Sequence, residues 1–165
     1  MTTTDLSGSR VVRYDLVGTA LFVVAMAVAV PLREERVGQV TIAAVSMVLF
    51  AAGAATALWA YASALERSRT DNVGVANLYL LTATTAPGRV RHLMWGCLAV
   101  QVAVSFAGAI VGVVGLDEGQ LNALAFGTLV PMFGIGANGV WAARHGTFGP
   151  RSVNRAERPN NRKIG

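Results

Sequence analysis

The chain has 165 residues, of which 53% are hydrophobic and 14% are charged, and its formal net charge is +5. About a quarter of the residues of a soluble domain are charged, so this composition excludes an ordinary soluble globular protein. The single cysteine, Cys97, excludes a disulfide framework and a thiol pair, and we expect it to be a small buried hydrophobic residue.

Four segments carry no charge at all, and they cover residues 16–32, 37–64, 93–116 and 121–143. A helix crosses a bilayer with roughly 20 apolar residues, and about 17 is the lower limit. We therefore predict an all-α integral membrane four-helix bundle over residues 14–145, with one span in each segment. We expect it in the plasma membrane as a multi-pass protein.

The residues before the first span, 1–13, are polar, and we expect them to form a cytoplasmic N-terminal tail. Near the end of the first segment, residues 27–29 read Ala-Val-Ala, which resembles a signal-peptidase cleavage site. The uncharged run is long for a signal peptide, so we interpret it as a retained helix, with cleavage as the alternative.

The second uncharged segment carries a line of small residues, and the loop after it contains a shorter apolar run. The small residues are Ser46, Gly53, Ala57 and Ala60. The run Val73–Pro87 has no charge but is too short to span a membrane. We predict a cytoplasmic interfacial segment that packs as a loop helix on the end of the bundle. The alternative is an amphipathic element that senses lipid or docks a partner.

Small and polar residues recur every three or four positions along the third and fourth segments, which keeps them on one face of each helix. Helices in lipid associate through close backbone packing and interhelical hydrogen bonds. We therefore predict a packing interface formed by Gln101, Ser105, Gly108, Gly112, Gly127, Pro131, Gly134 and Asn138.

The short third loop makes these two helices antiparallel neighbours and sets Gln101 level with Asn138. We predict a hydrogen bond between them, because a buried amide needs a partner; the alternative is that both line a polar path. Pro131 should kink the fourth helix, with a neighbour satisfying the freed carbonyl. Gly136 lies on the side of the fourth helix opposite the face that carries Gly134. We expect that side to meet either the second helix or another protein.

Basic residues indicate the orientation. Twelve of the fourteen lie in the N-terminal segment (two), the second loop (four) and the residues from 144 onward (six). Because basic loops stay on the cytoplasmic side, we predict an N-in, C-in topology with short outward loops. The basic cytoplasmic tail, 146–165, should be attracted to anionic lipid by about 1 kcal/mol per basic residue near the surface. Possible lipid or partner contacts are Arg67, Arg69, Arg89, Arg91, His92, Arg144 and His145.

No motif for catalysis is present: HExxH, P-loop, GxSxG and CxxC patterns are all missing. Asp15 falls at the cytoplasmic start of the first segment, so we expect no ionisable residue deep in a span. His92 and His145 should lie near each other at the interface, with metal or haem ligation as the alternative. We expect no cofactor, no metal and no enzymatic activity. No aromatic residues alternate with the tail arginines, so we expect no nucleic acid partner.

Two stretches, "LAFGTLVPMFGIGANGVWAARHGTF" (124–148) and "TAPGRVRHLMWG" (85–96), resemble uncharacterised small four-span membrane proteins of actinobacteria. The resemblance implies no activity and no functional residues. From the residues, we expect a non-catalytic accessory or assembly subunit of a larger inner-membrane complex, with other membrane subunits and anionic lipid as partners. The alternative is a small homo-oligomeric transporter or lipid-handling protein.

Overall fold

The structure is a computed structural model, and it describes residues 3–68, 73–82, 85–114 and 122–149. Over these ranges it contains helices and no strand. The helices are α1 (Thr3–Ala29), α2 (Arg36–Arg67), α3 (Val75–Tyr79), α4 (Gly88–Val113), the 3-10 helix η1 (Ala123–Leu129) and α5 (Pro131–His145).

Four helical stretches are long and apolar enough to cross a membrane: Arg10–Ala29, Arg36–Arg67, Gly88–Val113 and Ala123–His145. The predictions of an all-α protein and of four possible spans are therefore confirmed. These lengths and compositions indicate a multi-pass membrane protein.

The first helix begins earlier than the sequence suggested. α1 starts at Thr3, so most of the predicted N-terminal tail is helical. Arg10 and Arg13 are exposed, whereas Val12 and Asp15 are buried, so the helix continues through the charged positions with one face packed against the protein. As a result, Asp15 lies near the middle of α1, although it is close to the beginning of the stretch Arg10–Ala29 that could cross a membrane.

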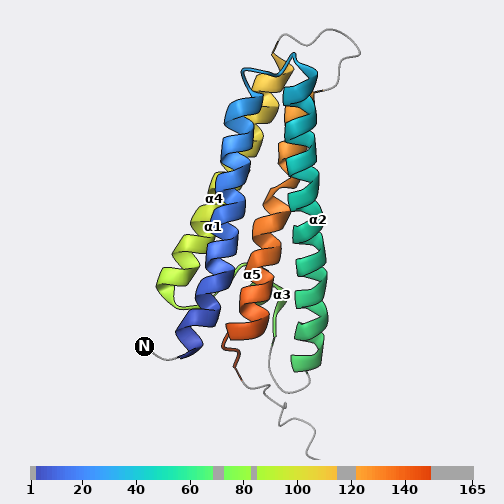
Figure 1. The fold of residues 1–165 in the computed structure, drawn as a ribbon. Coiled ribbons are helices and arrows are strands. Elements are labelled where there is room, and N and C mark those ends of the chain that lie inside the picture. Colours follow the sequence, from blue (N-terminus) through green and yellow to red (C-terminus); the bar gives the residue numbers. More distant parts are fainter. Residues whose placement is uncertain (1–2, 69–72, 83–84, 115–121, 150–165) are drawn as a thin grey trace, which may run out of the picture.

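The fourth span lies at the centre of the structure. Figure 1 shows η1 and α5 between α1, α2 and α4, which lie around it. Half of its most apolar window is buried, against 28–39% for the other three spans. The glycines of this span are therefore needed because neighbouring helices approach it on several sides.

α2 and α5 approach each other backbone to backbone. The small-residue line of α2, which includes Ser46, Gly53 and Ala57, is buried. A Cβ atom at Gly53 would lie 2.5 Å from the carbonyl oxygen of Met132, and one at Gly136 would meet the carbonyl oxygen of Gly53. The side of the fourth span opposite Gly134 therefore packs on the second span and is not open to a partner protein.

Pro131 breaks the fourth span instead of bending it. The 3-10 helix η1 ends at Leu129, and Pro131 occupies the first turn of α5, where its missing N–H and fixed φ are tolerated. Because Pro131 cannot donate to Gly127, the Gly127 carbonyl accepts from the hydroxyl of Ser105 on α4 at 2.7 Å and from the Val130 N–H at 3.0 Å. A neighbour does satisfy the freed carbonyl, as predicted.

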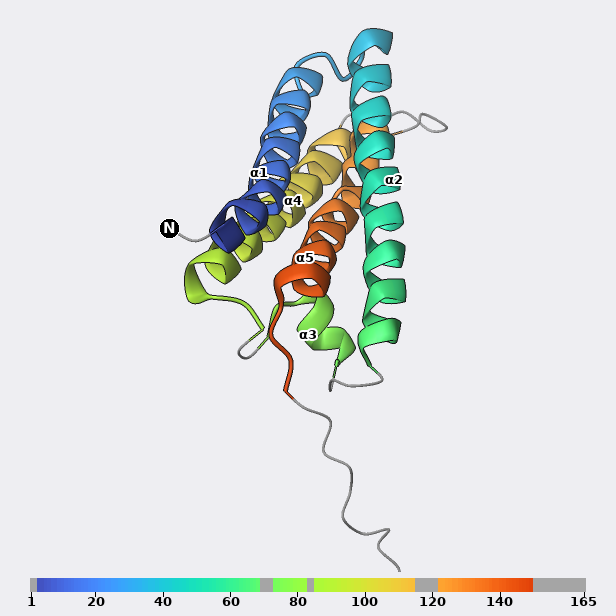
Figure 2. The same cartoon turned by 60° about the horizontal axis from the view of Figure 1, so that its bottom comes forward.

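The loop between α2 and α4 packs under the bundle. Figure 2 shows α3 beside the lower ends of α5 and α2. Leu78 and Leu81 of this loop are fully buried, and the Tyr79 hydroxyl donates to the Ala57 carbonyl at 2.8 Å. Burial raises the pKa of Tyr79, and the neighbouring Tyr61 raises it further, so the phenol keeps its proton and remains a donor. Of the two alternatives for this segment, the structure has the packed loop helix.

Replacing Tyr79 by phenylalanine should lower the stability of the folded protein by about 1 kcal/mol, the net worth of one hydrogen bond. The Ala57 carbonyl would lose its Tyr79 partner while the ring remained in place. Thermal unfolding in detergent measures the difference. Tyr61→Phe is the matched control, because Tyr61 is exposed; an equal loss in both variants would show that the Tyr79 bond contributes nothing.

Candidate functional site

A carboxyl group is buried between α1, α4 and α5. Asp15 on α1 has no exposed surface. Its Oδ1 accepts a hydrogen bond from Gln101 Nε2 of α4 at 3.3 Å, and its Oδ2 has no hydrogen-bond partner. Because Gln101 lies midway along α4, this carboxyl lies beside the middle of that helix, and Asp15 is the sixth residue of the apolar stretch Arg10–Ala29 of α1. Asp15, which the sequence placed at the start of a span, is therefore buried inside the bundle, and its depth in a membrane stays a prediction.

Gln101 links the three helices. Its Nε2 donates to Thr19 Oγ1 at 2.7 Å as well as to Asp15, and its Oε1 accepts from the backbone N–H of Gly134 at 3.2 Å. A backbone N–H only donates, so this last bond fixes which end of the amide faces α5. The amide hydrogens must then face Asp15 and Thr19.

The predicted bond between Gln101 and Asn138 is absent. Asn138 Nδ2 instead donates to the Tyr79 carbonyl at 3.0 Å. The prediction failed because it paired α4 only with the fourth span, whereas α1 and the α2–α4 loop supply nearer partners. Asn138 therefore ties α5 to α3 instead of to α4.

The predicted packing residues are buried except Pro131, which is half-buried, and they contact more than one neighbouring helix. Gln101, Ser105, Gly108 and Gly112 share one buried face of α4. A Cβ at Gly108 or at Gly127 would meet Met26 of α1, whereas one at Gly134 would meet Gln101. The α4 stripe and the fourth span thus both pack against α1 as well as against each other.

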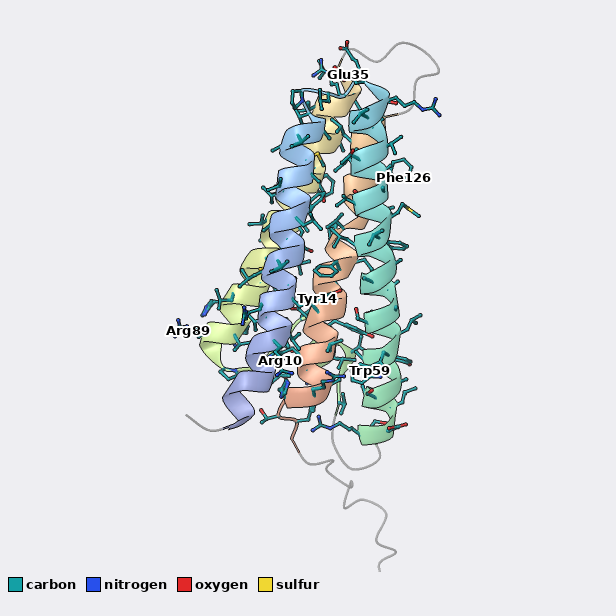
Figure 3. The ribbon with its side chains drawn as sticks, viewed as in Figure 1. Arg10, Tyr14, Glu35, Trp59, Arg89 and Phe126 are labelled. Atoms are coloured by element: carbon teal, nitrogen blue, oxygen red, sulfur yellow. The ribbon has the colours of Figure 1, made fainter. Side chains whose placement is uncertain are left out.

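A second feature is a groove of about 470 Å³ between α1 and α2, with α5 as its floor. Its lining residues are Arg10, Val11, Tyr14, Thr56, Trp59, Ala137, Val140 and Arg144. Figure 3 shows Arg10 and Tyr14 on the α1 side of α5 and Trp59 on the α2 side. Tyr14 and Trp59 are 53% and 43% exposed, so the groove opens sideways, where lipid would surround the protein.

The groove has a basic end and an apolar body. Arg10 opens the first span and Arg144 lies in the last turn of the fourth, so both guanidinium groups are at the same boundary of the bundle. The Arg144 guanidinium lies 4.7 Å from the centre of the Trp59 ring, a cation–π contact that holds it at the rim. No carboxylate is among the residues that line the groove.

The apolar part of the groove is fixed by aromatic packing. The Tyr14 ring lies 5.1 Å from the ring of Phe133, which is buried at the start of α5. Thr56 directs its hydroxyl to the carbonyls of Ala52 and Gly53 on its own helix. The groove therefore presents mostly carbon surface beside the two arginines, and its Thr56 hydroxyl is already bonded within α2.

The other predicted lipid or partner contacts are spread over the end of the bundle. Arg67 donates to the carbonyls of Ala143 and Gly146 at the end of α5, and its assignment as a lipid or partner contact stays a prediction. Arg89 and His92 are exposed on α4, and Arg91 is half-buried. Arg69 lies outside the described residues.

His145 stacks against Trp141 with ring centroids 5.8 Å apart. Among the described residues, no cluster of three or more His, Cys, Asp or Glu side chains is arranged to hold a metal ion. Neither His92 nor His145 therefore belongs to such a cluster.

Comparison of the chain with protein-family models, with curated proteins and with solved structures finds no match. The resemblance to four-span actinobacterial proteins thus stays a prediction.

Proposed function

We propose that this protein is a non-catalytic membrane protein that binds one anionic phospholipid in the groove between α1 and α2. The observation that carries the proposal is the pairing of Arg10 with Arg144 at one end of an apolar groove. The lipid phosphate lies between the two guanidinium groups, and an acyl chain lies along Ala137 and Tyr14. This is the lipid-handling alternative raised by the sequence.

Charge and position both support this ligand. Guanidinium groups form strong charge-assisted hydrogen bonds with phosphate oxygens. Trp and Tyr side chains are enriched at the level of lipid headgroups, where one end of the ring is apolar and the other is wet. Trp59 and Tyr14 line the groove next to the two arginines, so amphipathic aromatic side chains lie beside its basic end.

We further propose that both termini are cytoplasmic and that the basic end of the groove faces the inner leaflet. The distribution of Lys and Arg supports this orientation. Anionic lipids in the cytoplasmic leaflet attract basic residues near the surface. The groove would therefore draw its ligand from the leaflet that its arginines face.

Arg10→Gln and Arg144→Gln should each weaken phosphatidylglycerol binding about fivefold, the equivalent of about 1 kcal/mol per basic residue. Titration of the detergent-solubilised protein, followed by native mass spectrometry, counts the bound lipids. We expect one tightly bound phosphatidylglycerol per chain and much weaker binding of phosphatidylcholine, whose headgroup is zwitterionic.

The matched control is Arg89→Gln, which removes an exposed arginine from the same end of the bundle but outside the groove (Figure 3). If Arg89→Gln weakened binding as much as Arg10→Gln, lipid would be held by diffuse surface charge and the groove assignment would fail. If no lipid bound and foreign subunits co-purified instead, the accessory-subunit prediction from the sequence would be favoured.

A further inference from the structure

Lipid binding in the groove does not explain the buried carboxyl of Asp15, which is not among the residues that line the groove. Asp15 has no exposed surface, and its Oδ2 has no hydrogen-bond partner. An ionised carboxylate without a countercharge is costly to bury, and an ionisable side chain inside a membrane span marks a functional site by default. Something must therefore balance the charge of this group.

No positively charged side chain is placed to do so among the described residues. On α4, the basic side chains Arg89, Arg91 and His92 are in the first turns, and on α5, Arg144 and His145 are in the last turn. The titratable side chain that lies beside Asp15 on α4 is the thiol of Cys97. Arg10 and Arg13 on α1 itself are exposed, so no basic side chain of these three helices is the partner of Asp15 among the described residues.

A metal cation does not fit the surrounding groups either. Calcium takes 6–8 oxygen ligands, and any small cation needs several oxygens that converge on it. Here Gln101 directs its amide hydrogens toward Asp15 and Thr19, because its oxygen is held by the Gly134 N–H. Thr19 Oγ1 accepts from the same amide, so Asp15 Oδ2 is the one oxygen of this trio left without a bond.

We propose that Asp15 is a proton-binding site inside the membrane-spanning region: its carboxyl carries a proton at neutral pH and exchanges that proton with the solution. The proton is held on Oδ2, and Gln101 fixes Oδ1. This inference rests on the α1–α4–α5 contact and is independent of lipid binding in the groove.

Infrared spectroscopy of the protein in lipid tests the proposal, because the carbonyl stretch of a protonated carboxyl is separated from the bands of an ionised carboxylate. We expect the protonated band in the wild type at neutral pH and its loss in Asp15→Asn. Asparagine keeps an oxygen that accepts from Gln101, so this variant should fold. The band should move when water is replaced by D₂O.

Three outcomes would overturn the proposal. An absent band would mean that Asp15 is ionised, and a band that does not move in D₂O would mean a trapped proton with a purely structural role. A band that disappears when sodium chloride replaces choline chloride at equal ionic strength would identify a sodium site. As a second measurement, labelling by dicyclohexylcarbodiimide, a membrane-soluble reagent for protonated carboxyls, should add one whole carbodiimide to Asp15 and none to Asp15→Asn.

Discussion

Gly53→Leu should reduce the stability of the folded protein by about 3 kcal/mol, the upper end of the usual cost of overpacking. The reason is that a Cβ at this position would lie 2.5 Å from the Met132 carbonyl oxygen and from the N and Cα atoms of Phe133. These are backbone atoms, so no rotation of a side chain relieves the contact. α2 and α5 would have to separate at the point where the fourth span is broken.

Thermal unfolding in detergent measures this loss, and Gly96→Leu is the matched control. Gly96 is on α4, and an added Cβ there meets nothing within 4 Å. Gly136→Leu should behave like Gly53→Leu, because it faces the Gly53 carbonyl from the other helix. If Gly53→Leu unfolded at the same temperature as Gly96→Leu, the close approach of α2 and α5 would be wrong.

Gln101→Leu should lower stability by about 2–6 kcal/mol. The change leaves the Gly134 N–H and Asp15 Oδ1 without the partners that they now have, and each unsatisfied buried polar group costs about 1–3 kcal/mol. Leucine occupies a similar volume, so the loss reports the missing hydrogen bonds and not a cavity.

Two measurements distinguish this effect from general damage to α4. Chemical denaturation gives the free energy of unfolding, and Val100→Leu, an exposed neighbour on the same helix, should leave it unchanged. Hydrogen exchange at the Gly134 amide should accelerate in Gln101→Leu. An unaltered exchange rate would contradict the role of Gln101 at the start of α5.

Much of the fold was predictable from local patterns. Charge-free segments gave four spans, and the three- and four-residue spacing placed Gln101 and Gly108 on one buried face of α4. The effect of Pro131 was predictable in part, because proline removes a hydrogen bond wherever it occurs. That Ser105 would be the residue to satisfy the Gly127 carbonyl depended on which helix lies beside it.

The residues that sequence reasoning missed owe their position to contacts between distant parts of the chain. Asp15 looked like the edge of a span because a charge normally ends one. It is buried because Gln101, 86 residues away, supplies a hydrogen bond. Arg10, Tyr14 and Trp59 are ordinary residues for the end of a span, and they form a groove because α1 and α2 both pack on α5. The sequence feature that could have indicated this burial is the position of a charged residue, Asp15, close to the boundary of an apolar segment.

The central position of the fourth span has a consequence for biosynthesis. It is the last of the four spans to leave the ribosome, and its mean hydropathy is 1.4, against 1.8 to 2.0 for the others. Before the fourth span is synthesised, α5 does not yet pack against the faces of α1, α2 and α4 that carry Asp15, Gly53 and Gln101. We expect packing on the three preceding helices to assist the entry of this less apolar segment into the membrane, so that its insertion and the final folding step are coupled.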